Sequence, residues 1–75
     1  MAKCWTIKEF SKLTSVTVRT LQYYDDEDIL KPHHKSYAGY RSYSEHELLC
    51  LQKINVLKYI GFNLKQIKAI LSNES

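Results

Sequence analysis

The sequence predicts a small, mostly α-helical domain of four helices with one two-stranded β-hairpin. The chain has 75 residues, of which 44% are hydrophobic and 25% charged, and this is the size and composition of one globular domain. Helix-capping residues recur four times, each followed by apolar residues at helical spacing. Between the second and third of these patterns, the sequence changes to one typical of short strands and a turn.

The first helix is predicted at about residues 7–13. Thr6 and Glu9 form a capping box, in which the hydroxyl accepts the third helical N–H and the carboxylate accepts the N–H of the cap. The apolar residues that follow are expected to lie on one face of this helix: Ile7, Phe10 and Leu13. After a short turn at residues 14–16, Thr17 caps a second helix that is expected to reach about residue 26.

Residues 32–43 predict the hairpin. Pro32 is disfavoured inside a helix, Gly39 permits a tight turn, and the tyrosines at 37, 40 and 43 favour extended backbone. The expected arms are about residues 32–36 and 40–43, and at least one of Tyr40 and Tyr43 should pack on a helix.

Two further caps predict the last two helices. Ser44 with Glu47 opens the longest helix, which is expected to end before Gly61. Asn63 with Gln66 opens a helix that ends near residue 71. Because no repeat, linker or low-complexity segment divides the chain, residues 1–75 are predicted to form one domain.

Several classes of function are not expected. No apolar run approaches the roughly 18 residues of a membrane span, and the start lacks a secretory signal, so we expect a cytoplasmic protein with no membrane partner. Cys4 and Cys50 lack metal-ligand spacing, and neither a glycine-rich phosphate loop nor a catalytic motif accompanies the three histidines. We therefore predict no catalytic residues, no metal site and no cofactor.

The distribution of charge points to a polyanion as partner. The formal net charge is +3, but an acidic run at residues 25–28 separates two cationic blocks, at residues 1–24 and 29–43. Such a pattern suggests contact with an anionic surface at two places.

The second predicted helix has a polar outer face suited to DNA. At about 100° per residue, Arg19, Gln22 and Tyr23 lie opposite the inner stripe of Leu21 and Tyr24. Arginine and glutamine can form bidentate hydrogen bonds with base edges, and a phenol can donate to phosphate. A short helix, a turn and a helix with this face is the layout of a helix-turn-helix, and Thr17 at its cap is included in the predicted interface.

The hairpin that follows extends this interface. It carries cationic and polar side chains that can grip the sugar-phosphate backbone beside the groove: His34, Lys35, Tyr40 and Arg41. The predicted fold is therefore a winged helix-turn-helix.

Five segments in order resemble the N-terminal DNA-binding domain of the MerR family of transcriptional regulators. They are TIKEF (6–10), VTVRTLQYYD (16–25), LKP (30–32), GYRSY (39–43) and IGFNLKQI (60–67). The resemblance covers nearly the whole chain and implies a homodimer on a palindromic promoter site. It also implies that the protein bends and untwists an over-long promoter spacer, so that RNA polymerase can engage both promoter elements.

The resemblance also implies site residues. Arg19 and Tyr23 match recognition-helix contacts, Tyr40 and Arg41 match wing contacts, and Lys65 matches a cation beside a second wing around residues 61–63. The family continues into a dimerisation helix and an effector domain, both of which are absent from this chain.

Three positions depart from the family pattern. Ser15 and Asp28 replace usual glycines and are expected to need positive φ. Gln22 replaces a usual arginine, which shifts the expected base preference toward adenine.

Two alternative functions remain open at this point. An excisionase-like architectural protein has a similar small winged domain and bends DNA without activating transcription. A protein-interaction module would use a second apolar stripe on the third helix, at Leu49, Val56 and Ile60, which one small domain does not need for its own core. A dimer partner's helix could also cover this stripe.

Overall fold

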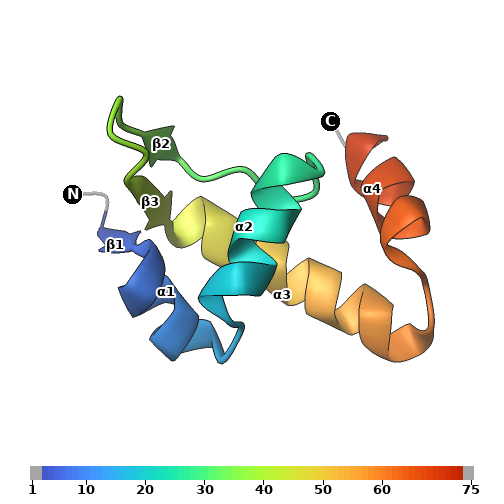
Figure 1. Ribbon diagram of the computed structural model, residues 1–75. Helices are drawn as coiled ribbons and strands as arrows, with labels where there is room; N and C mark the ends of the chain where they lie inside the picture. The colour runs from blue at the N-terminus through green and yellow to red at the C-terminus, as the bar shows by residue number, and fades with distance from the viewer. Residues whose placement is uncertain (1–2, 74–75) are drawn as a thin grey trace.

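Four α-helices and a three-stranded antiparallel sheet form the domain, as the computed structural model in Figure 1 shows for the described residues, 3–73. The elements follow in the order β1 (Cys4–Thr6), α1 (Ile7–Thr14), α2 (Val18–Asp26), β2 (His34–Lys35), β3 (Arg41–Ser44), α3 (Glu45–Ile60) and α4 (Leu64–Ser72). The predicted fold class is confirmed, and all four helices lie close to their expected bounds.

Capping boxes fix the helix starts. At α1, Thr6 Oγ1 accepts from Glu9 N at 3.2 Å and Thr6 N donates to Glu9 Oε1 at 2.9 Å. Asn63 and Gln66 make the same reciprocal pair at the start of α4. These bonds satisfy backbone donors that a helix end would otherwise leave without partners, so the chain starts its helices where the sequence indicated.

The sheet has one strand more than the sequence predicted. β3 lies between β1 and β2 and pairs antiparallel with both, with Cys4 opposite Ser44 and His34 opposite Ser42. The prediction of a two-stranded sheet was therefore incomplete. β1 has only three residues, too few for an alternating pattern to identify it.

The hydrophobic core lies between the sheet and the helices. It is formed by Phe10, Leu21, Tyr24, Leu30, Tyr43, Leu51, Ile54 and Ile67. Phe10 and Tyr43 stack with ring centroids 4.5 Å apart, which confirms that one wing tyrosine packs on a helix. Burial raises the pKa of Tyr43 to about 12, and its hydroxyl has no hydrogen-bond partner among residues 3–73. Tyr43 therefore stays a neutral core residue.

Leu13 departs from the expected apolar face of α1. It is 51% exposed, whereas Phe10 is fully buried. A spacing of three residues on a helix drifts by about 60° at each step, so the third member of the Ile7, Phe10 and Leu13 set turns away from the core. The buried part of the expected apolar face therefore does not extend to Leu13.

Ser15 and Asp28 both adopt positive φ, of 62° and 61°, as expected where they replace glycine. Because left-handed backbone strains a residue with a Cβ, Ser15→Gly should raise the free energy of unfolding by about 0.5–1 kcal/mol. Urea unfolding measures this. Ser15→Ala is the matched control, since it keeps the Cβ. An equal gain in both variants would contradict the conformational explanation.

Candidate nucleic-acid interface

The outer face of α2 is polar and open to solvent. Arg19, Gln22 and Tyr23 are all exposed, Tyr23 by 49%. The opposite face carries Leu21 and Tyr24, which are buried. The structure therefore brings three of the predicted DNA-contact residues onto one accessible face.

Thr17 holds the start of this helix. Its Oγ1 accepts from Thr20 N at 3.1 Å, and its hydroxyl donates to Thr20 Oγ1 at 2.8 Å. Thr17 is exposed, but its hydroxyl is engaged in capping. Its direct role in this structure is thus to fix the N-terminal turn of α2, near Arg19.

The hairpin forms a projecting wing beside α2. In Figure 1 the turn between β2 and β3 extends beyond the helices, and Tyr40 next to this turn is 77% exposed. His34 and Lys35 on β2 are also exposed. The turn is closed by bonds from Ser36 N to Tyr40 O and from Gly39 N to Ser36 O, both 2.9 Å.

Arg41 has an environment that the sequence did not predict. Its side chain is only 16% exposed, and its Nε donates to Asp25 Oδ2 at 2.8 Å. Lys35 Nζ lies 3.0 Å from the same oxygen, and Lys31 Nζ lies 3.0 Å from Asp25 Oδ1. One carboxylate on α2 therefore binds cations from the following loop and from both strands of the wing. We call these four residues the Asp25 cluster.

Charge neutralisation stabilises the buried carboxylate. The Asp25 side chain is 1% exposed. Burial alone would raise its pKa, but hydrogen bonds from Arg41, Lys31 and Lys35 outweigh burial and lower the pKa from 3.8 to about 2. Because the folded pKa is depressed, this contribution of about 2–3 kcal/mol is present above about pH 4 and is lost as the pH falls through about 2.

Lys31 has a second acidic neighbour. Its Nζ lies 3.2 Å from Asp28 Oδ1 as well as near Asp25. Hydrogen bonds to Asp25 and then to Asp28 raise its pKa. Lys31 therefore stays charged, and its side chain remains 61% exposed.

Asp25 and Lys31 were missed by the sequence analysis, which treated residues 25–28 as a uniform acidic run. A signal was available in the spacing. Asp25 lies seven residues after Val18, which is close to two full helical turns, and four residues after the buried Leu21, so it shares the inner face of α2 with them. A carboxylate on that face requires cationic partners.

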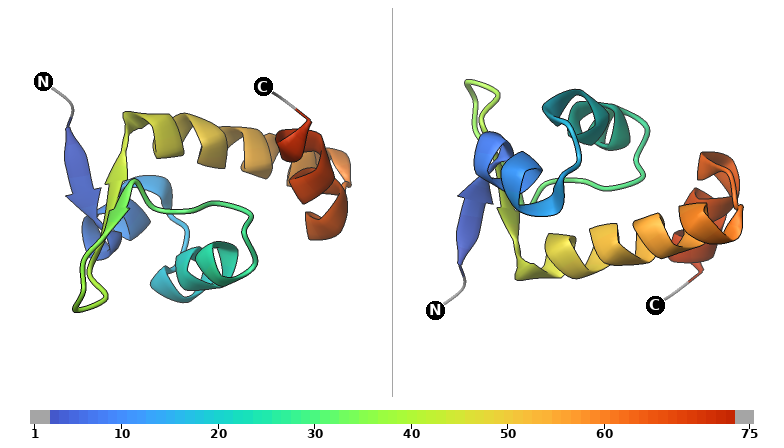
Figure 2. Two further views of the ribbon diagram at one scale, coloured as in Figure 1. Left: turned by 90° about the horizontal axis from the view of Figure 1, so that it is seen from above. Right: turned by 90° about the horizontal axis from the view of Figure 1, so that it is seen from below.

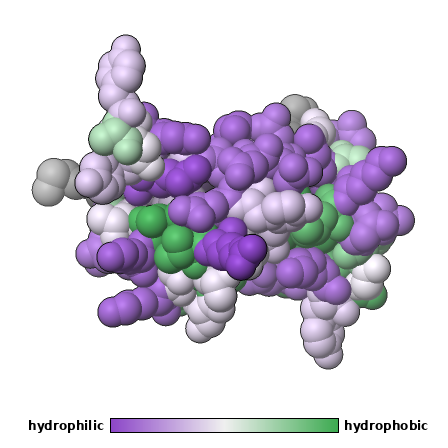
Figure 3. All heavy atoms as spheres, in the orientation of Figure 1, coloured by the Kyte–Doolittle hydropathy of each residue, from purple (hydrophilic) through white to green (hydrophobic). Residues whose placement is uncertain are grey.

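Lys65 lies away from the other predicted contacts. It is exposed in the first turn of α4, and Figures 1 and 2 show α4 and the sheet at opposite ends of α3. α2 lies between these two ends. In Figure 3 hydrophilic side chains cover much of the surface over the C-terminal part of α2 and the loop after it.

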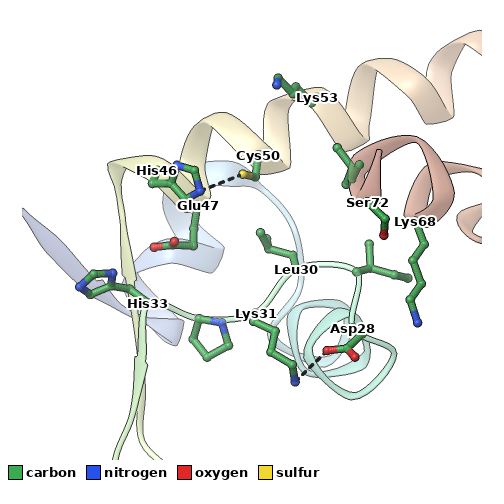
Figure 4. Close-up of a pocket in the computed structure, with 13 residues that line it drawn as sticks. Asp28, Leu30, Lys31, His33, His46, Glu47, Cys50, Lys53, Lys68 and Ser72 are labelled. Atoms are coloured by element: carbon green, nitrogen blue, oxygen red, sulfur yellow. Dashed lines mark hydrogen bonds and ion pairs between the residues drawn. The ribbon is translucent and has the colours of Figure 1, made fainter. Parts of the chain in front are cut away.

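A hollow with both polar and apolar lining residues lies between the loop after α2, α3 and α4 (Figure 4). Within it, His46 Nε2 contacts Cys50 Sγ at 3.7 Å. The buried Glu47 carboxylate accepts bonds from both the backbone N–H and the hydroxyl of Ser44. Glu47 is thus occupied in capping α3, and these groups do not form an ordered nucleophile, base and carboxylate.

Neither a metal centre nor a membrane span is found in the described part of the chain. Residues 3–73 hold no group of three or more His, Cys, Asp or Glu side chains placed for a metal ion. None of the helices there combines the length and apolar character that a membrane span needs.

Comparison with protein families gives a match over almost the whole chain. The model of the MerR HTH family regulatory protein matches residues 5–74. The HTH-type transcriptional activator mta of Bacillus subtilis is 39% identical over 92% of this chain and 27% of its own length. The HTH-type transcriptional activator TipA of Streptomyces coelicolor is 38% identical over the same shares. The chain spans about a quarter of the length of these curated relatives.

Solved structures agree with the sequence comparison. The N-terminus of the Bacillus subtilis multidrug transporter activator, MtaN, superposes with a TM-score of 0.87 at 38% identity, covering 95% of this chain and 67% of that one. A MerR family regulator from Bacillus cereus also gives a TM-score of 0.87 at 38% identity, covering 97% of this chain and 55% of that one.

Proposed function

Because the chain belongs to the MerR family of helix-turn-helix regulatory proteins, we propose that α2 enters the major groove of promoter DNA while the β2–β3 wing contacts the adjacent backbone. The observation that carries this proposal is the exposed polar face of α2 next to a wing bound to the same helix. The family and its relatives are regulators, so the prediction that the chain is not an enzyme is confirmed. Family membership also favours a regulator over an excisionase-like protein.

The three exposed side chains of α2 are suited to different groups on the DNA. Arg19 is suited to guanine through a bidentate bond, and Gln22 to adenine. Tyr23 carries a phenol that can donate to a phosphate. Thr17 supports this surface from the helix start, since its hydroxyl caps α2.

The wing supplies sequence-independent contacts. His34, Lys35 and Tyr40 are exposed and are proposed to contact sugar and phosphate groups. Arg41 acts mainly from the base of the wing, where it is bound to Asp25. Lys65 on α4 is proposed as a second contact with the DNA backbone. It lies on the opposite side of α2 from the wing (Figures 1 and 2).

Regulation by the whole protein would need a pair of such domains. We propose that residues 1–75 act as one domain of a homodimer in the cytoplasm, which distorts the promoter and so allows RNA polymerase to engage it. Support comes from the exposed apolar stripe of Leu49, Val56 and Ile60, which are 61%, 57% and 63% exposed. An apolar groove continues from this stripe toward Ile70 and Leu71 on α4 and suits a partner helix.

Arg19→Ala tests base recognition. The variant should lose roughly 1–3 kcal/mol more on the preferred site than on random duplex, because one base contact is removed together with the cation. Sites selected from a randomised duplex pool, followed by titration at two salt concentrations, give both quantities.

The isolated wild-type chain should bind duplex DNA weakly and with salt sensitivity, since a single half-site neutralises few phosphates.

Lys12→Ala is the matched control, because Lys12 is an exposed cation on α1 outside the proposed base-contact face. Lys12→Ala should lower the affinity for all duplexes alike, because it removes one cation without removing a base contact. Unchanged site preference in Arg19→Ala would refute the proposed base contact. No duplex binding by the wild-type chain at low salt would refute the proposed function itself.

A further inference from the structure

We propose that Asp25 is a positioning residue for DNA binding, which fixes the wing to the C-terminal end of α2 so that helix and wing meet DNA as one rigid surface. This inference rests on the proposed function. It assigns to a buried carboxylate, which itself contacts no base, control over the spacing of the two proposed DNA contacts.

The first support is connectivity. Asp25 Oδ2 binds Lys35 of β2 at 3.0 Å and Arg41 of β3 at 2.8 Å. Among the described residues, every hydrogen bond or ion pair between side chains of α2 and the hairpin ends on Asp25. The hairpin is anchored to β1 on one side of β3, and the Asp25 cluster supplies its polar link to α2.

The second support is burial. Both wing cations reach a carboxylate that is 1% exposed. Water screens the Arg41 pair least, because the Arg41 side chain is itself only 16% exposed. An aspartate side chain is short and has few rotamers, and Oδ1 is held from the other side by Lys31. The position of Asp25 therefore determines where the base of the wing lies.

The third support is charge. Three cations surround Asp25, so the cluster stays positive even though Asp28 shares Lys31. Lys31 and Lys35 keep 61% and 45% of their side chains exposed. The carboxylate thus orders cations at a surface that attracts DNA without making that surface negative.

Asp25→Asn separates positioning from simple electrostatics. The substitution removes one negative charge, so charge alone predicts tighter DNA binding. Positioning predicts the opposite: a roughly tenfold loss of duplex affinity, and a salt dependence shallower by about one unit for each phosphate that the wing no longer reaches. Asp26→Asn is the matched control, because Asp26 is the exposed neighbour on the same helix and its substitution makes the same change in charge. It should bind DNA as well as the wild type or better.

A measurement without DNA tests the wing directly. Backbone ¹⁵N relaxation and amide exchange of residues 34–41 should show greater mobility in Asp25→Asn, and wild-type behaviour in Asp26→Asn. Both variants are compared at a temperature where circular dichroism shows them folded. Asp25→Glu keeps the carboxylate and should restore much of the wing order and the affinity, which covers the case in which Asp25→Asn does not fold.

The outcomes are distinct. A wing as ordered in Asp25→Asn as in the wild type, or an unchanged or higher duplex affinity, would overturn the positioning role and leave the proposed function intact. If the wild-type chain bound no duplex, the proposed function would fail, and the relaxation data would still decide whether Asp25 fixes the wing.

Discussion

Fusing a dimerising coiled coil to the C-terminus of the chain is expected to raise its affinity for a palindromic duplex by roughly 10²–10⁴. The physical reason is effective concentration: once one domain has bound its half-site, the tether holds the second near the other half-site. A single side-chain contact on α2 or the wing reaches at most the lower end of this range, because a good base contact contributes roughly 1–3 kcal/mol and each tenfold gain requires about 1.4 kcal/mol.

Sedimentation of the isolated chain and duplex titration of the fusion measure this effect. Several linker lengths are needed, since a tether that cannot span both half-sites gives no gain. A fusion whose coiled coil carries charged substitutions in its apolar seam is the monomeric control. A tight dimer of the isolated chain would contradict the expectation that it binds one half-site as a monomer. No gain at any linker length would contradict the proposal that a dimer is required.

Phe10→Ala is expected to cost about 3–5 kcal/mol of unfolding free energy. Phe10 is fully buried and stacks on Tyr43 at 4.5 Å, so its removal leaves a cavity between α1 and the sheet. A domain of this size has a total stability near the lower end of roughly 5–15 kcal/mol. Much of the variant should therefore be unfolded at moderate temperature.

Leu13→Ala is the matched control on the same helix. Leu13 is 51% exposed, so its truncation should cost less than about 1 kcal/mol. Urea unfolding monitored by circular dichroism compares the two variants. Similar losses would mean that α1 packs through a different face in solution.

The helices could be predicted because their determinants are local. The reciprocal bonds at Thr6 and Asn63 join residues three positions apart, so the sequence alone contains both partners. The same holds for the exposed face of α2, where regular helix geometry placed Arg19, Gln22 and Tyr23 together. The left-handed positions of Ser15 and Asp28 followed from the family pattern, in which glycine is usual.

The features that the sequence did not reveal depend on distant partners. β1 is recognised only through its pairing with β3. Arg41 has the residue type of a phosphate contact, but its burial depends on Asp25, which lies 16 positions earlier. The elements of the interface could therefore be predicted from the sequence. Which residues in them are exposed for DNA contact, and which hold the wing in position, could be inferred only from the structure.

The pairing of β1 with β3 has a kinetic consequence. The strands join residues 4–6 to residues 42–44, so α1, α2 and the first arm of the hairpin lie within the loop that their pairing closes. Each helix can begin to form from its own cap on a microsecond timescale or faster, but closing a long loop costs chain entropy before the contacts between its ends are gained. The long sequence separation of this one pairing makes sheet closure, rather than helix formation, the step expected to limit the folding rate.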